Sequence, residues 1–242
     1  MKSLKSPSYG LARILSKQGV CSRSEAERRI RDGRVRVHGR VVRDPEFPTS
    51  IEGHDIDVDG LAIYPLGRVY LMLNKPRGLV TTTVDEQGRE TVYRCFDGAG
   101  LPWIAPVGRL DKASEGLLLL CNDPAWAAVI TGPSTGPDKK YHVQIDRIPD
   151  AALIARMITG FEVEGEQLSA KSAVLLRAGE KNAWLEIVLD EGRNRQIRRL
   201  LAAFDIAVLR LVRVSIGSLE LGDLARGQWR ELTSDEREAL VS

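Results

Sequence analysis

The sequence is poor in the residues that build disulfide frameworks and most metal sites. Its 242 residues include three cysteines and three histidines, and both sets are scattered along the chain. This argues against a disulfide framework, a zinc site and a catalytic pair with histidine as the base. No stretch approaches the ~18 consecutive apolar residues of a membrane span, and the first ten residues lack the apolar core of a secretory signal. These absences predict a cytoplasmic protein without a metal or a membrane partner.

The sequence also has little net charge, but its charges are unevenly distributed. The formal net charge is +2. Residues 1–44 contain 12 Lys and Arg against four acidic residues, whereas the other 198 residues contain 23 against 29. The first segment therefore carries +8 and the remainder −6. Such asymmetry indicates a basic docking module on an oppositely charged body, although a solvated basic face without a partner has the same composition.

The basic segment has the pattern of a small folded domain. Apolar residues at helical spacing predict one helix between Leu11 and Gly19. Ser22 with Glu25 is a capping-box pair that predicts the start of a second helix. Valines that alternate with arginines after Gly33, followed by a His-Gly pair, predict a β-hairpin.

The arginines of this segment divide by their local partners. Arg29 and Arg31 each follow a glutamate by four residues, a spacing that allows a local ion pair. The arginines without such a partner are Arg23, Arg28, Arg34, Arg36 and Arg40. Unpaired arginines suit contacts with phosphates of a nucleic acid. We therefore expect Lys17 and the first four of these arginines to bind RNA.

The remainder of the chain has the pattern of an α+β domain. Strands are predicted over 69–73, 107–110, 117–121, 141–145, 173–176 and 184–189, with a further strand after a turn at 74–78. Helices are predicted over 123–130, 150–159 and 194–203. Strands outnumber helices and many connections are short, which favours a mostly antiparallel sheet.

Three segments of this domain carry residues suited to chemistry. In the segment 106–123, Arg109 and Asp111 interrupt an apolar pattern, which fits either a β-hairpin with acidic turn residues or a positioned carboxylate. A carboxylate beside arginines is favoured in its ionised form, as nucleophilic attack at a sugar C1′ requires. The segment 190–200 has four arginines, and the simplest interpretation is a solvated basic helix. Arg198, however, lies next to the apolar residues that this helix would bury, and a buried guanidinium would need a carboxylate partner such as Asp111. Tyr141 leads a strand and is by itself a packing residue.

These motifs resemble two known families. The segment "LARILSKQGVCSRSEAERRIRDGRVRVHGRVV" resembles the S4 RNA-binding domain. The segments "LMLNKPRGLVTT", "GRLDKASEGLLLLCND", "KKYHVQ", "EGRNRQIRRL" and "GSLELGDLARGQWREL" are together similar to the RsuA/RluB/RluE/RluF branch of the pseudouridine synthases. The resemblance implies an S4 domain over residues 8–60, followed by a catalytic domain of mostly antiparallel sheet over residues 69–242.

The resemblance also implies residue roles. Asp111 matches the family's catalytic aspartate, Tyr141 the tyrosine that packs against the target base, and Arg198 the arginine that pairs with the aspartate. Lys75 and Arg109 match positions near the RNA-binding cleft, and the helix that carries Arg193 and Arg195 is expected to contact the RNA backbone. No cofactor or metal is implied.

The implied function is the isomerisation of a uridine in ribosomal RNA to pseudouridine. The base must be flipped out of its stack to reach Asp111. The motif details favour 23S over 16S rRNA as the target, and we expect a monomer that acts on rRNA or a pre-ribosomal particle. Two alternatives remain at this point. One is a non-catalytic S4-domain protein that binds RNA or assists ribosome assembly, and the other is a glycoside hydrolase that uses Asp111 and Glu115.

Overall fold

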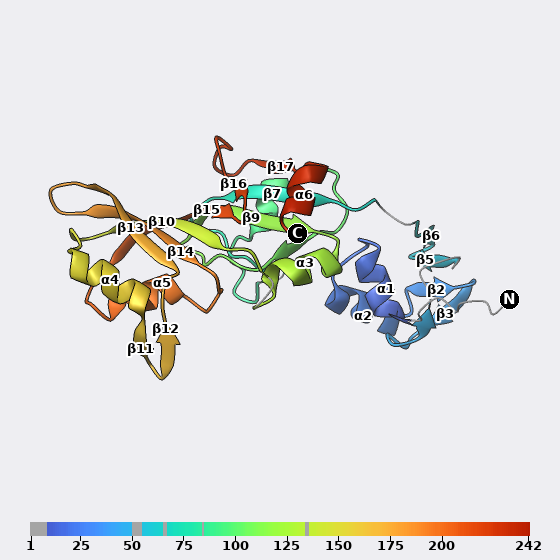
Figure 1. Cartoon of the computed structure of the whole chain (residues 1–242). Coiled ribbons are helices and arrows are strands. Elements are labelled where there is room, and N and C mark those ends of the chain that lie inside the picture. The colour runs from blue at the N-terminus through green and yellow to red at the C-terminus, as the bar shows by residue number, and fades with distance from the viewer. Residues whose placement is uncertain (1–8, 50–54, 65–66, 84, 134–135) are drawn as a thin grey trace. The chain divides into compact units, whose positions relative to one another are not determined.

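The computed structural model describes residues 9–49, 55–64, 67–83, 85–133 and 136–242. The chain divides into two compact units (Figure 1). The first contains the described residues up to Val69 together with Gly98–Ala105 and Cys121–Pro124, and the second contains the remainder. Residue 8, where we expected the first domain to begin, lies outside the described residues. Within the described ranges, no helix has the length and apolar character needed to cross a membrane.

The first unit is built from two helices and several short strands. The helices are α1 (Leu11–Lys17) and α2 (Arg23–Arg31). The strands are β1 (Tyr9–Gly10), β2 (Val35–Val37), β3 (Arg40–Val42), β4 (Pro48–Thr49), β5 (Ile56–Val58) and β6 (Leu61–Ala62). Strands β3, β2, β5 and β6 form an antiparallel sheet in that order, and β1 pairs with β4. One core unites the apolar faces of both helices with the sheet.

The predicted boundaries of these elements are confirmed by their local chemistry. Gly19, which follows α1, has a φ of +70°, a value that glycine adopts without strain. The Ser22 hydroxyl accepts a hydrogen bond of 3.1 Å from the Glu25 amide and caps α2. His38 and Gly39 join β2 to β3 with φ values of 51° and 74°, as a tight hairpin turn with two left-handed residues requires.

The second unit is a large sheet with helices. Its strands are β7 (Tyr70–Lys75), β8 (Ala105–Val107), β9 (Glu115–Cys121), β10 (Lys139–Ile145), β11 (Phe161–Val163), β12 (Glu166–Leu168), β13 (Ser172–Ala178), β14 (Ala183–Leu189), β15 (Val208–Ile216), β16 (Leu219–Glu220) and β17 (Trp229–Glu231). Its helices are η1 (Val92–Phe96), α3 (Pro124–Thr131), α4 (Ala151–Thr159), α5 (Gln196–Ala202) and α6 (Ser234–Ala239). The α+β class with a mostly antiparallel sheet is confirmed.

The sheet order brings distant segments together. The strands run β13-β14-β10-β15-β9-β7-β17, with β16 beside β15 and β8 beside β9. Strands β14, β10 and β15 are antiparallel neighbours, whereas β15 and β9 pair in parallel. Strands β11 and β12 form a separate hairpin, which projects from the sheet close to α4 and α5 in Figure 1. Helix α5 buries Ile197, Leu200 and Leu201, as the spacing of its apolar residues predicts.

Two predicted strands are wrong in this unit. The segment after the turn at 74–78 forms a single bridge between Val80 and Thr91 instead of a strand. The strand predicted over 107–110 ends at Val107, because Gly108 takes a φ of +74° and bends the chain into the following turn. Both segments lie near Asp111, where the backbone is held by isolated hydrogen bonds, such as those of Gly78 with Lys112 and of the Thr81 hydroxyl with Leu110, rather than by a continuous strand ladder.

Candidate active site

A pocket of about 600 Å³ lies at the ends of strands β10, β14 and β15 in the second unit. Its wall includes residues 107–111, residues 191–198 and side chains of the sheet. Asp111, Tyr141 and Arg198 all line it, although they lie far apart in the sequence. The structure therefore brings together the three residues that the sequence suggests for catalysis.

The turn that carries Asp111 is held from several directions. Within the turn, the Ser114 amide donates to the Asp111 carbonyl at 2.9 Å. From residues 75–81, the Gly78 amide donates to the Lys112 carbonyl at 2.8 Å, and the Thr81 hydroxyl donates to the Leu110 carbonyl at 2.7 Å. A backbone held at so many points fixes the direction of the Asp111 side chain.

Lys75 lies beneath this turn and is completely buried. Its ammonium donates hydrogen bonds to the carbonyls of Asp111 at 3.2 Å, Ser114 at 2.9 Å and Pro76 at 3.1 Å. Burial lowers the pKa of Lys75 to about 8, an effect opposed by the negative charge of Asp111. The expectation that Lys75 binds RNA is wrong, because its ammonium is hydrogen-bonded to backbone carbonyls and the side chain does not reach the surface.

The Asp111 carboxylate forms an ion pair of 3.5 Å with Arg195. This corrects the predicted pairing with Arg198. The Arg198 guanidinium instead donates to the carbonyls of Val208 at 3.3 Å and Ala113 at 3.4 Å. Burial and the neighbouring charge of Arg195 lower the pKa of Arg198, while Asp111 raises it. Arg198 thus lies close enough to act on Asp111 electrostatically, and it also binds the turn that carries this residue.

Arg195 owes its position to an unusual backbone. It stands directly before α5 with φ 50° and ψ 29°, in the left-handed region that residues other than glycine seldom adopt. Strain of this kind is concentrated at functional sites, where the surrounding structure holds it in place. Nothing in the order of residues 193–199 indicates which of their arginines meets the carboxylate.

Tyr141 lies on β10, opposite Ile187 of β14 and Arg213 of β15. Its side chain is mostly buried but lines the pocket. Among the described residues, none forms a hydrogen bond with its hydroxyl. A rigid aromatic side chain with an unengaged polar end can both stack on a base and exchange a proton with it.

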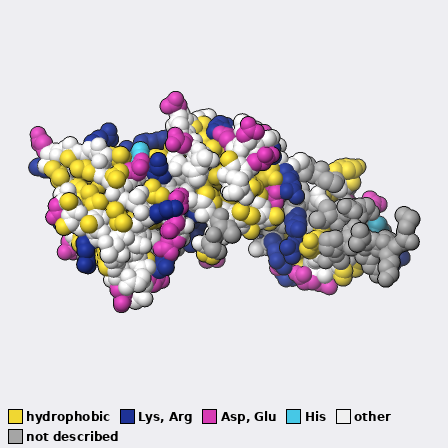
Figure 2. Space-filling view, viewed as in Figure 1, with side chains coloured by type: hydrophobic (Ala, Val, Ile, Leu, Met, Phe, Trp, Pro, Cys, Tyr) yellow, Lys and Arg dark blue, Asp and Glu magenta, His cyan; other side chains and the backbone are white. Residues whose placement is uncertain are grey.

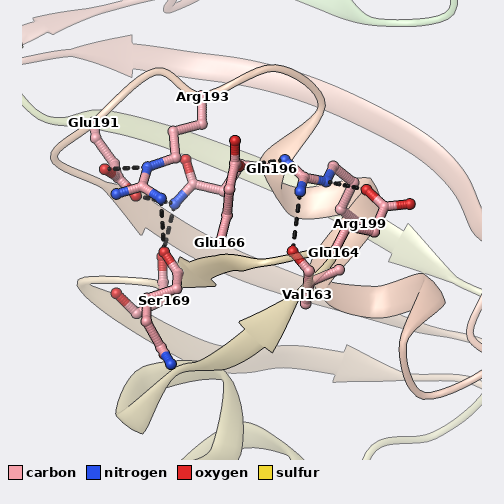
Figure 3. Close-up of polar contacts among 9 residues, drawn as sticks. Val163, Glu164, Glu166, Ser169, Glu191, Arg193, Gln196 and Arg199 are labelled. Atoms are coloured by element: carbon pink, nitrogen blue, oxygen red, sulfur yellow. Dashed lines mark hydrogen bonds and ion pairs between the residues drawn. The ribbon is translucent and has the colours of Figure 1, made fainter.

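The other arginines of the segment 191–199 bind the hairpin of β11 and β12 (Figure 3). The Arg199 guanidinium pairs with Glu166 at 2.7 Å and Glu164 at 3.2 Å. Arg193 pairs with Glu191 at 2.8 Å and donates to the Gln167 carbonyl at 2.8 Å. Arg193, which we expected to bind RNA, therefore has both of these partners within the protein.

Gln196 completes this group of contacts. Its side-chain amide donates to the Ser169 carbonyl at 2.9 Å and to the Glu191 carboxylate at 2.7 Å (Figure 3). The residue is almost fully buried at the start of α5. These bonds fasten the pocket-lining segment 191–196 to the chain that leads out of the hairpin.

The first unit presents basic side chains to solvent, and Figure 2 shows them gathered over α1 and α2 beside acidic ones. The predicted pairs of Arg29 and Arg31 with glutamates four residues earlier are confirmed. Three arginines that we expected to be unpaired have partners after all: Arg23 binds Glu46 at 3.0 Å and Glu27 at 3.5 Å, Arg28 binds Glu25 at 2.6 Å, and Arg34 binds Asp59 at 2.7 Å.

The prediction considers only glutamates that lie four residues before an arginine. Most of the observed partners do not have this spacing: Glu46 and Asp59 are distant in the sequence, and Glu25 lies three residues before Arg28. Among the described residues, none forms an ion pair with Arg36 or Arg40. Lys17 lies over the ring of Tyr9, with its ammonium 4.3 Å from the ring centroid. In the second unit, Arg109 is exposed and lines the pocket, again without an ion pair to any described residue.

Two further residues near Asp111 have surroundings that the sequence does not predict, and one of them is Glu115, which the hydrolase alternative pairs with Asp111. Glu115 is buried and accepts a two-pronged ion pair from Arg210, at 3.0 and 3.1 Å, directly after the Asp111 turn. Arg213 is also buried and lines the pocket. An arginine inside an alternating apolar strand is a signal that could locate Arg213, whereas the partner of Glu115 lies 95 residues away.

Comparisons with known proteins agree with the two family resemblances that the sequence motifs indicate. The family model described as RNA pseudouridylate synthase matches residues 69–203, and that of the S4 domain matches residues 10–56. The chain is 36% identical over 230 residues to the ribosomal large subunit pseudouridine synthase B of Bacillus subtilis, and the match covers 93% of each chain. It is 35% identical over 235 residues to an uncharacterized RNA pseudouridine synthase of Rickettsia typhi, covering 97% of this chain and 96% of that one. A crystal structure of a pseudouridylate synthase matches with a TM-score of 0.65 and 32% identity, over 96% of this chain and 100% of that one.

Proposed function

This chain belongs to the RNA pseudouridine synthase family, and we propose that it converts a uridine of large-subunit ribosomal RNA to pseudouridine with Asp111 as the nucleophile. As a member of the family it is an isomerase that acts on RNA. The reaction breaks the bond between C1′ and N1, turns the uracil and joins its C5 to C1′. The proton on C5 is lost and N1 gains one, so that the product is an isomer of the substrate.

The observation that carries the nucleophile assignment is the position of Asp111. Its carboxylate lines a pocket large enough for a flipped nucleotide and lies 3.5 Å from the Arg195 guanidinium. Its backbone is held by Lys75 and by residues of the neighbouring segment. A fixed carboxylate can attack C1′ directly, or it can assist removal of a proton from the ribose on a route through a glycal. Both routes need the same residue.

Tyr141 and Arg198 have supporting roles in this proposal. Tyr141 stacks against the uracil and assists the proton transfer from C5, because its hydroxyl is free of partners among the described residues. Arg198 keeps the Asp111 turn in place through the Ala113 carbonyl, and its positive charge interacts with the nearby carboxylate of Asp111.

The first unit and the exposed arginines of the second supply affinity for RNA. Flipping a nucleotide costs a few kcal/mol, which contacts with backbone phosphates can offset. Lys17, Arg23, Arg28, Arg34 and Arg36 are the candidates in the first unit, and Arg109 and Arg195 are those nearest Asp111. The named activity of the Bacillus subtilis relative supports large-subunit rRNA as the substrate. The presence of Asp111, Tyr141 and Arg198 in one pocket supports an enzyme over a protein that only binds RNA.

The test uses the full chain with transcribed 23S and 16S rRNA and maps pseudouridine in each. We expect one or more new pseudouridines in 23S rRNA, and none with Asp111→Asn, which keeps the shape of the side chain but not its charge. The affinity of this variant for RNA should be nearly unchanged. Asp223→Asn, an exposed carboxylate outside the pocket, serves as the control and should be fully active. Activity retained by Asp111→Asn would refute the nucleophile assignment, and modification of 16S rRNA alone would refute the substrate.

A further inference from the structure

Arg213 is a buried cation in the pocket wall, and no described residue supplies a counter-ion for it. It is 6% exposed and lines the pocket from β15. Its Nε donates a hydrogen bond of 2.7 Å to the Leu117 carbonyl. Its Nη2 is buried and has no hydrogen-bond partner, and no carboxylate among the described residues forms an ion pair with it. The guanidinium thus has one neutral partner and unused donors.

This arrangement is unfavourable unless a ligand completes it. A guanidinium does not lose its proton in proteins, and burial of an uncompensated charge is strongly destabilising. Two neighbouring arginines of the pocket have carboxylate partners, since Arg195 pairs with Asp111 and Arg193 with Glu191. Arg198 forms no ion pair with a described residue and has a buried Nε without a hydrogen-bond partner, but the negative charge of Asp111 acts on it. Arg213 is more deeply buried than Arg198 and has no ion pair among the described residues.

A second cation lies beside it. Lys139, at the start of β10, is half-buried and lines the same pocket, and it forms no ion pair with any described residue. Burial and the nearby charge of Arg213 lower the pKa of Lys139, whereas the charges of Asp138 and Asp190 raise it. Because Lys139 forms no ion pair with any described residue, its ammonium can join the Arg213 guanidinium in binding an anion in the pocket.

The position of Arg213 is fixed relative to Asp111. Strand β15 pairs in parallel with β9 at Val212 with Glu115 and at Arg213 with Gly116, directly after the Asp111 turn. Gly116 has a φ of +99°, and a Cβ there would overlap the backbone of Arg213, so that only glycine permits this approach. On the other side, Arg213 lies opposite Tyr141. The cation therefore stands between the proposed base-stacking tyrosine and the strand that begins at the catalytic turn.

We propose that Arg213, together with Lys139, binds a phosphate group that flanks the flipped uridine. The proposal rests on the proposed function only in that the pocket takes a uridine nucleotide. Uridine itself is neutral, and the groups of the substrate that carry a full negative charge are its phosphates. The planar guanidinium presents parallel donors that match two phosphate oxygens. A phosphate held at a fixed point would set the ribose, and hence C1′, at a fixed distance from Asp111.

The test measures binding without catalysis, so that it is independent of whether pseudouridine forms. The full ¹⁵N-labelled chain is titrated with uridine, with uridine 5′-monophosphate and with uridine 3′-monophosphate, and the affinities are read from NMR shifts. We expect one of the monophosphates to bind about tenfold more tightly than uridine or better, a preference equivalent to one charge-assisted contact of ~1.4 kcal/mol.

The variants assign that preference to a residue. Arg213→Gln should abolish it, whereas Arg177→Gln removes the same charge from an exposed position on β13, outside the pocket, and should leave the preference unchanged. Lys139→Gln leaves the bond between Arg213 and Leu117 intact and should reduce the preference in part. This variant also keeps the test valid if Arg213→Gln fails to fold, which thermal unfolding would reveal.

Three results would overturn the proposal. The wild-type chain could bind uridine and both monophosphates equally, or the preference could persist in Arg213→Gln. Alternatively, Arg213→Gln could leave all three affinities unchanged and lower only the rate of isomerisation on RNA. That outcome would assign Arg213 to the uracil anion that is released when the C1′–N1 bond breaks.

Discussion

The chain has two arginine-rich segments, residues 23–43 of the first unit and residues 193–199 of the second, and they use their charge differently. In the first, Arg28 pairs with Glu25 on the same helix and keeps 67% of its side chain exposed. In the second, Arg199 is 21% exposed and binds Glu166, which lies 33 residues earlier in the chain. The first segment keeps its cations available to a partner, and the second uses them to join parts of its own unit.

The role of a cation thus follows from its surroundings rather than from its abundance. Ion pairs between exposed residues contribute little to stability and are readily exchanged for phosphate contacts. Cations that bind buried backbone carbonyls, such as Lys75, cannot be exchanged, since their removal leaves the carbonyls without a partner.

The largest loss of stability on removal of a cation should appear at the buried Lys75. Lys75→Met removes a buried ammonium and leaves two carbonyls of the Asp111 turn and that of Pro76 without this donor, so the free energy of unfolding should fall by ~2–4 kcal/mol and activity should be lost with it. Urea unfolding measures the first effect. Lys112→Met, an exposed lysine of the same turn, is the matched control and should unfold like the wild-type chain.

The wild-type chain and Lys75→Met also give a pH test. The pKa of Lys75 falls from 10.5 to about 8 in the folded chain. Between these values the unfolded chain holds a proton that the folded chain has released, so this group adds stability to the folded wild-type chain as pH rises. The stability gap between wild type and Lys75→Met should widen from pH 8 to 10.5, by at most ~3 kcal/mol. A gap that narrows over this range would contradict the assignment of the shift to Lys75.

An intermediate effect is expected at Arg199. Arg199→Met removes the partner of Glu164 and Glu166 and should loosen the hairpin of β11 and β12, because no other ion pair among the described residues holds these two carboxylates. Hydrogen exchange of residues 161–168 should become several-fold faster, with a smaller loss of activity through the adjoining segment 191–196. Arg177→Met, on the exposed strand β13, is the control. Unchanged exchange in the hairpin would show that Arg199 does not anchor it.

The smallest effect on stability, with a clear effect on binding, is expected in the first unit. The double variant Arg36→Gln and Arg40→Gln removes two exposed cations that lack an ion pair with any described residue. Its thermal unfolding should match that of the wild-type chain. The salt dependence of RNA binding should become shallower, by about one unit of slope for each RNA phosphate that these arginines neutralise in the wild-type complex. If the slope is unchanged, these two arginines do not bind the RNA backbone.

Much of the fold follows from local patterns. The helix caps at Ser22 and Asp150, and the alternation along β14, place these elements to within a few residues. The segments around 78–82 and 107–110 are wrongly predicted as strands. Their backbone is bonded at isolated points instead, by the Thr81 hydroxyl at Leu110 and by single backbone bonds such as that from the Gly78 amide to the Lys112 carbonyl. Interactions of this kind have no periodicity that a sequence could display.

Residue types and their spacing along the chain are enough to indicate the class of fold and the basic character of the first unit. The resemblance of the motifs to a known family adds the three residues Asp111, Tyr141 and Arg198, which the pocket brings together. Three other outcomes depend on tertiary structure: Arg195 meets the carboxylate, Lys75 is buried, and Arg213 has no carboxylate partner among the described residues. Each of them depends on which distant segments become neighbours and on how much water they exclude. The +2 net charge therefore hides the exposed cations of the first unit and, in the second unit, buried cations such as Lys75 and Arg213 alongside exposed ones.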